Sequence, residues 1–200
     1  MDKLLSVFLP AYFLAFFGFA FLWRSWRTWR STGINPYRLN TSTGVEALVH
    51  RYFRLMPLLS LGVLVCYLLP GDAYALLAPI TWLEFTPLQM FGMALMTAAL
   101  VIMLVAQSEM GASWRIGVDH EHATEFVRAG LFRYSRNPIF LGVLLSVFGY
   151  FLVLPNAVTL LTLVLDLVLM QVQIQLEEEH LSAAHGEAYE DYCCRVRRWL

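Results

Sequence analysis

The chain has 200 residues, of which 58% are hydrophobic and 14% are charged, and its formal net charge is −1. A soluble domain carries about 25% charged residues, so this composition argues against an ordinary soluble fold. The missing charge is concentrated in long apolar runs, which is typical of a membrane protein. The net charge itself says little about partners, because the charges are sorted by position along the chain.

Five apolar runs are long enough to cross a hydrocarbon core about 30 Å thick. In chain order they cover residues 4–23, 53–70, 88–106, 138–154 and 157–175. A further run, 73–83, is shorter and is broken by Pro79, so we interpret it as interfacial. Pro155-Asn156 is a turn signal, which predicts that the last two runs form a tight antiparallel hairpin. The sequence therefore predicts an all-α polytopic membrane protein with about five transmembrane helices.

The basic residues support an odd number of spans. All 14 lysines and arginines except Lys3 fall in the segments 24–54, 115–136 and 195–198. Five spans place these segments on one side of the membrane, whereas four or six spans scatter them. By the positive-inside rule, the N-terminus is then outside and the C-terminal tail is cytoplasmic.

Tryptophan and arginine each recur every third residue between Trp23 and Arg30. This spacing keeps the side chains near one face of a helix, where Trp sits at headgroup level and Arg reaches lipid phosphate. We therefore expect the arginines of 24–54 to anchor the chain to membrane lipids, and we expect no nucleic-acid partner.

Two long polar segments meet the predicted cytoplasmic face, the loop 107–137 and the tail 177–200. A connection of about thirty residues is uncommon in a compact protein unless it serves a function. We therefore divide the chain into 1–106, with three spans, and 107–200, a core in which loop, hairpin and tail enclose a site.

The last predicted span carries three polar residues, Asp166, Gln173 and Glu177, at spacings of seven and four. These spacings place them on one stripe of a helix. An ionisable group deep in a membrane is costly unless it is paired or faces water, so Asp166 either contacts another helix, for instance at Ser146, or belongs to a binding site. Glu177 extends the stripe to the membrane boundary, which favours a binding role for it.

Asn137-Pro138 has the chemistry of a helix start, with Asn at the N-cap and Pro at the first helical position. Gly142 would allow close approach of a backbone or a flat ligand. Arg136 beside this helix terminus makes the spot attractive to a carboxylate.

These residues carry a resemblance. Arg136-Asn137-Pro138-Ile139-Phe140-Leu141-Gly142, a hairpin, and then Glu177-Glu178 with Leu181, Gly186, Tyr189, Tyr192, Val196 and Arg198 resemble the isoprenylcysteine carboxyl methyltransferase family, which is related to phospholipid methyltransferases. The resemblance covers roughly residues 107–200. It implies an S-adenosylmethionine-dependent methyltransferase whose cofactor is enclosed by the last two helices, the preceding loop and the folded tail.

The resemblance also implies roles for individual residues. The cofactor-binding positions are Phe126, Val127, Phe132, Asn137, Pro138, Ile139, Phe140, Gly142 and Glu177, with Glu177 and Arg136 as catalytic candidates. Gln173 stands where the family has an arginine for the substrate carboxylate, so Gln173, Arg115 and Asp166 are the substrate-binding candidates. The expected acceptor is a lipophilic small molecule or lipidated substrate, with the carboxylate of a prenylated cysteine as one possibility.

Alternatives remain at this point. A membrane reductase using NADPH, similar to sterol reductases, shares such a helical core, and a non-catalytic lipid-binding protein would also be apolar. The chain contains no Gly-x-Gly nucleotide loop, which excludes a soluble Rossmann methyltransferase. We expect neither a metal site nor a disulfide from Cys66, Cys193 and Cys194. The oligomeric state and the roles of Asp166 and of Cys193 and Cys194 stay open.

Overall fold

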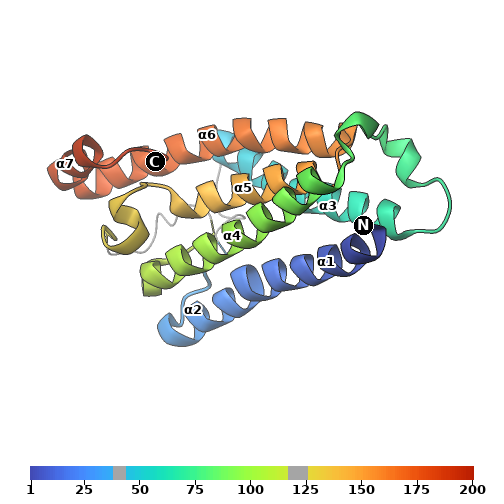
Figure 1. Cartoon of the computed structure of the whole chain (residues 1–200). Coiled ribbons are helices and arrows are strands. Elements are labelled where there is room, and N and C mark those ends of the chain that lie inside the picture. Colours follow the sequence, from blue (N-terminus) through green and yellow to red (C-terminus); the bar gives the residue numbers. More distant parts are fainter. Residues whose placement is uncertain (38–43, 117–125) are drawn as a thin grey trace.

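Long helices account for most of the chain, as the computed structural model shows for the described residues 1–37, 44–116 and 126–200 (Figure 1). The main helices are α1 (Asp2–Ala15), α2 (Arg24–Thr32), α3 (Gly44–Leu68), α4 (Thr86–Met110), α5 (Pro138–Val153), α6 (Ala157–His185) and α7 (Glu187–Arg195). A π-helix, η1 (Phe16–Trp23), joins α1 to α2, and short 3-10 turns lie at η2 (Tyr74–Leu77), η3 (Thr81–Leu83), η4 (Gly111–Ser113) and η5 (Gly130–Arg133).

The prediction of an all-α polytopic membrane protein is confirmed. Four helical stretches are long and apolar enough to cross a membrane, namely Asp2–Thr32, Gly44–Leu68, Thr86–Ser113 and Ala157–His185. The fourth predicted span, 138–154, forms α5, which is apolar but has only 16 residues. The apolar runs therefore all become helices, and one of them is shorter than an ordinary membrane span.

The segments that carry most of the basic residues lie at one end of the bundle. Figure 1 shows α2, the C-terminal end of α4 and α7 there, with the N-terminus at the other end. The residues around 69–85 also lie at the N-terminal end of the bundle (Figure 1). This arrangement agrees with the sorting of charge, and which end faces the cytoplasm stays a prediction.

The predicted hairpin is confirmed, since α5 ends at Val153 and α6 begins at Ala157. Asn156 caps α6 by accepting hydrogen bonds from the backbone nitrogens of Val158 and Thr159, both at 3.0 Å. The Thr159 hydroxyl donates back to Leu154 at 2.8 Å, which completes the turn. The residues that predicted the turn thus also provide hydrogen-bond partners for its backbone groups.

Close packing of α5 against α4 depends on glycine. A Cβ atom on Gly149 would lie 2.8 Å from the Gly92 carbonyl oxygen, and one on Gly142 would lie 3.0 Å from the Ala99 carbonyl oxygen. Small residues at such positions let two membrane helices approach closely. Gly142, predicted to bind a cofactor, therefore faces α4, and its missing side chain serves helix packing.

The Trp and Arg repeat continues the first helix beyond its apolar run. Trp23, Trp26 and Trp29 are exposed, and the Arg27 and Arg30 guanidinium groups lie over the Trp23 and Trp26 rings. This geometry suits the predicted lipid anchoring.

Arg24 departs from that prediction. Its residue is only 4% exposed, its guanidinium group donates to the Gly111 carbonyl oxygen, and it stacks over Trp114. This arginine therefore joins the first helix to the segment after α4, and is not available to lipid headgroups.

Candidate functional site

A cavity of about 490 Å³ lies inside the bundle and extends to the end where α7 lies. Side chains from α1, α3, α4, α5 and α6 surround it, together with residues from the segments after α2 and α4. Its interior is mostly apolar; from the first helix it receives Phe13, Phe16, Phe17 and Phe21, and from α4 it receives Met96, Met103 and Met110. A volume of this size is ordinary for a small-molecule site.

Nearly all of the residues that the sequence singled out line this cavity. They are Arg115, Phe126, Val127, Phe132, Arg136, Asn137, Pro138, Ile139, Phe140, Asp166, Gln173 and Glu177. Gly142 does not line it, because it packs against α4. The structure therefore brings together residues that are up to 62 positions apart, from Arg115 to Glu177.

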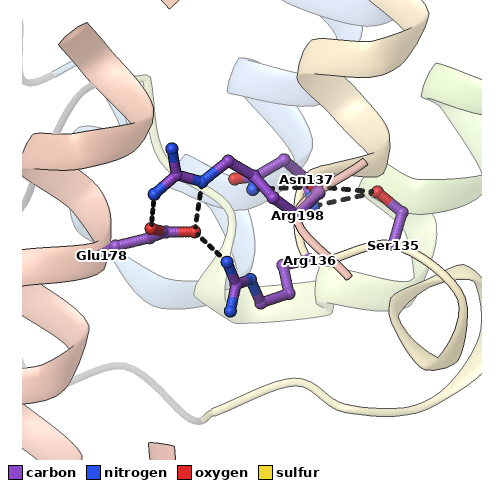
Figure 2. Close-up of polar contacts among 5 residues, drawn as sticks. All are labelled: Ser135, Arg136, Asn137, Glu178 and Arg198. Atoms are coloured by element: carbon purple, nitrogen blue, oxygen red, sulfur yellow. Dashed lines mark hydrogen bonds and ion pairs between the residues drawn. The ribbon is translucent and has the colours of Figure 1, made fainter. Parts of the chain in front are cut away.

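At the charged end of the cavity, one carboxylate binds two arginines. Glu178 on α6 accepts from Arg136 at 3.1 Å and from the Nε of Arg198 at 3.2 Å, with a second, shorter contact from the Arg198 Nη2 (Figure 2). The carboxylate expected beside Arg136 is therefore that of Glu178. Because Arg198 belongs to the chain end, this cluster ties the tail to the start of α5.

Backbone contacts reinforce the same junction. The Arg198 carbonyl oxygen accepts from the Asn137 amide nitrogen Nδ2 at 3.2 Å and from the Ser135 hydroxyl at 3.5 Å (Figure 2). The Arg136 backbone nitrogen donates to the Arg197 carbonyl oxygen at 2.9 Å. Asn137 does occupy the N-cap position of α5, as predicted, but its side chain makes no capping bond. Its amide holds the tail instead.

Sequence reasoning missed Glu178 and Arg198 as members of the site. Both residues belong to the motif that carries the resemblance, but neither is among the site residues predicted from the sequence. The available signal was the motif itself, which places the Glu177-Glu178 pair and Arg198 at fixed separations.

An aromatic cluster closes the same end of the cavity. The Phe126 ring lies 5.2 Å from His185, 5.5 Å from Tyr189 and 5.0 Å from Tyr192, measured between ring centroids. The Tyr192 hydroxyl donates to the Phe132 carbonyl oxygen at 2.7 Å. Burial raises the pKa of Tyr192 to about 12, so this hydroxyl remains a donor at neutral pH. Helix α7 is thus fixed against the segment before α5.

The polar stripe of α6 faces the cavity as predicted. Gln173 is 1% exposed, and its Nε2 donates to the Glu177 carboxylate at 3.0 Å. The Gln173 Oε1 is buried without a hydrogen-bond partner among the described residues, and so is the Arg136 Nε. Buried polar atoms are nearly always paired, so these two atoms indicate a site for a polar ligand.

The predicted alternative contact between Asp166 and Ser146 is wrong. The Ser146 hydroxyl forms its hydrogen bond with the Tyr12 hydroxyl of α1, at 2.6 Å. The physical reason is that α1 packs against this part of α5, where the Tyr12 and Tyr150 side chains share one core cluster.

These features give the cavity two chemically different parts. One end offers aromatic faces, a carboxylate pair, an arginine Nε and an amide oxygen, which suit a flat, polar, charged molecule. The interior offers mostly hydrocarbon, which suits a lipid chain. The two parts are continuous, so ligands bound in both would meet.

Comparison with known proteins agrees with this geometry. Residues 88–188 match the family model described as phospholipid methyltransferase. A search of curated proteins gives no match. The matched region runs from α4 through the hairpin to the start of α7 and so includes most of the site. It confirms the expected kinship with membrane methyltransferases, and this chain belongs to the phospholipid methyltransferase family.

Proposed function

We propose that this membrane methyltransferase transfers a methyl group from S-adenosylmethionine to a lipophilic acceptor. The observation that carries the proposal is that one cavity joins an aromatic and charged end to an apolar interior. A soluble cofactor needs polar surroundings and a lipid acceptor needs apolar surroundings, and methyl transfer requires the two molecules to be in contact.

The charged end fits the cofactor. The unpaired Arg136 Nε is a donor suited to a carboxylate, while the Gln173 Oε1 and the Glu177 carboxylate are acceptors suited to an ammonium group. The Phe126, Tyr189 and Tyr192 rings lie nearby as faces for a purine. When bound, S-adenosylmethionine supplies a methyl group activated by a sulfonium centre.

The chain's own contribution is positioning and exclusion of water. Displacement at a methyl group needs little acid–base chemistry, so alignment of the two reactants supplies most of the acceleration. The contacts of Arg136, Asn137 and Arg198 hold the tail over the charged end, which limits the access of water. We further propose that this end lies at the cytoplasmic face, in agreement with its basic residues.

The acceptor enters the proposal as a class. The apolar lining supports a lipid chain, and a prenylated cysteine carboxylate is one candidate. The family's arginine for that carboxylate is replaced by Gln173, and Arg115 or Arg136 on the cavity wall could take its place; Arg54 lines the same cavity.

The test is calorimetric titration of the purified protein in detergent with S-adenosylmethionine, its demethylated product and NADPH. We expect micromolar binding of the first two and none of NADPH. Glu177→Ala should abolish binding, whereas Glu179→Ala, a change at an exposed residue on the same turn, should not. Binding of NADPH alone would instead support a membrane reductase.

A second assay addresses the acceptor. Radiolabelled S-adenosylmethionine is supplied with a farnesylcysteine analogue, and methyl transfer is measured in wild type and in Gln173→Arg. Activity acquired only by the variant would show that the native acceptor lacks that carboxylate. Absence of transfer in both proteins would refute the prenylcysteine candidate and leave the cofactor assignment to the calorimetry.

A further inference from the structure

A second group of polar side chains lines the cavity far from its charged end. Tyr12, Ser146 and Asp166 all reach the cavity wall. Ser146 precedes Pro155 by nine residues and Asp166 follows it by eleven, so at about 1.5 Å per residue both lie at a similar depth from the hairpin turn. Tyr12 shares that depth because its hydroxyl contacts Ser146. We call these three residues the mid-bundle subsite.

The hydrogen-bonding capacity of this subsite is incomplete. Asp166 is 3% exposed, and its carboxyl group has no hydrogen-bonding or ionic partner among the described residues. Tyr12 and Ser146 share one hydrogen bond but possess two hydroxyl protons, so one proton is left over whichever of them donates. The subsite therefore offers an unused acceptor group and an unused donor to the same cavity.

Distance separates the subsite from the proposed cofactor end. Asp166 and Gln173 are seven residues apart on α6, which corresponds to about 10 Å along the helix axis. Met170 lies between them and reaches the cavity wall, and Phe140 and Val143 line the wall from α5. A ligand that fills the cavity would therefore be polar at the charged end, apolar in the middle and polar again at the subsite.

We propose that the mid-bundle subsite binds a hydroxyl group carried on the apolar chain of the methyl acceptor. A hydroxyl donates one hydrogen bond and accepts others, so it can use both the Asp166 carboxyl group and the spare hydroxyl proton. An ammonium group can only donate, and a plain hydrocarbon chain would leave both groups unmatched in a buried site. The inference rests on the proposed function only in naming the ligand as the acceptor.

The experiment uses the full chain in phosphatidylcholine nanodiscs, because this lipid carries no hydroxyl group. Thermal unfolding is followed by tryptophan fluorescence with dodecanol, dodecylamine or dodecane added. Dodecanol should raise the unfolding midpoint most. Asp166→Leu and Ser146→Ala should need at least about tenfold more dodecanol for the same shift, which is the effect of losing one buried hydrogen bond.

The matched control is Thr162→Val. Thr162 lies one turn before Asp166, is buried, and bonds only to the Val158 carbonyl oxygen of its own helix among the described residues. It does not line the cavity, so its replacement should leave the dodecanol response unchanged.

Three results would overturn the inference. A lower midpoint for ligand-free Asp166→Leu with an unchanged dodecanol response would show that Asp166 serves only packing. A larger response to dodecylamine than to dodecanol would refute the hydroxyl assignment, and an equal response to dodecane would refute polar recognition. Titration with S-adenosylmethionine tests the proposed function separately. Failure of the wild type to bind it would refute the cofactor site, whereas the dodecanol response alone decides whether the mid-bundle subsite binds a hydroxyl group.

Discussion

Neutralising Glu178 should release the C-terminal tail from the site. Glu178→Gln preserves the shape of the side chain but removes the charge that binds Arg136 and Arg198. The Glu178 and Arg136 side chains are each 14% exposed, and that of Arg198 is 35% exposed. Breaking a fully buried pair costs about 3–5 kcal/mol and an exposed pair contributes about 0–1 kcal/mol, so for this partly screened cluster we expect about 2 kcal/mol. That corresponds to about a thirtyfold shift in the docking equilibrium of the tail.

Limited trypsin digestion read by intact-mass spectrometry measures this shift directly, because cleavage at Arg195 or Arg197 requires an undocked tail. Glu178→Gln should be trimmed faster than wild type and should bind S-adenosylmethionine more weakly. The matched control is Glu179→Gln, since Glu179 is exposed and bonds to Gln175 on the outside of the same helix. Equal trimming rates in the two variants would refute the role assigned to the Glu178 cluster.

Three further predictions concern the tail, the helix contact and the hairpin. Since burial raises the pKa of Tyr192 from 10.0 to about 12, tail docking should be fully stable below pH 10 and be lost as the pH approaches 12. The ultraviolet titration curve of wild type minus that of Tyr192→Phe should show a transition near pH 12, and a midpoint near 10 would contradict this pKa. Gly149→Ala places a Cβ atom 2.7 Å from the Met96 side chain, so it should lower the free energy of unfolding by about 1–3 kcal/mol in a thermal unfolding assay. Gly62→Ala, with open space around it, should not lower it, and equal unfolding midpoints for the two variants would contradict the close contact. Asn156→Ala removes the α6 cap and should cost about 1–2 kcal/mol in the same assay, and an unchanged midpoint would show that the cap is dispensable.

Helix positions were predictable where local chemistry marks them. Pro138 and Ala157 begin their helices at the residues expected from the sequence. A proline in the first helical position marks the start of α5, and the side-chain cap of Asn156 marks the start of α6. The other boundaries extend beyond the apolar runs. Helix α3 begins at Gly44, nine residues before its apolar run, and α6 continues to His185, ten residues after its own. Hydropathy reports the part of a helix in lipid, while residues such as Glu and Ala continue it in water.

The residues that line the site were predictable from the sequence, but the contacts between their side chains were not. Motif spacing placed Glu177 and Asn137 on the cavity wall. It did not reveal that Glu178 would bind Arg198, because that contact depends on the direction in which the tail folds back. Arg24 shows the same limit: its burial against Trp114 requires the segment after α4 to reach the first helix, which no local pattern encodes.

The shortness of α5 has a consequence for the surrounding bilayer. Sixteen residues rise about 24 Å, about 6 Å less than an ordinary hydrocarbon core, which creates a hydrophobic mismatch beside the cavity. The hairpin turn must then either lie below the headgroups or draw the bilayer thinner around it. Asn156 is fully buried and its side-chain atoms bond within the turn, so the turn brings few unsatisfied polar groups to that depth. A thinned annulus of lipid next to α5 would shorten the path by which a membrane-borne molecule reaches the protein interior.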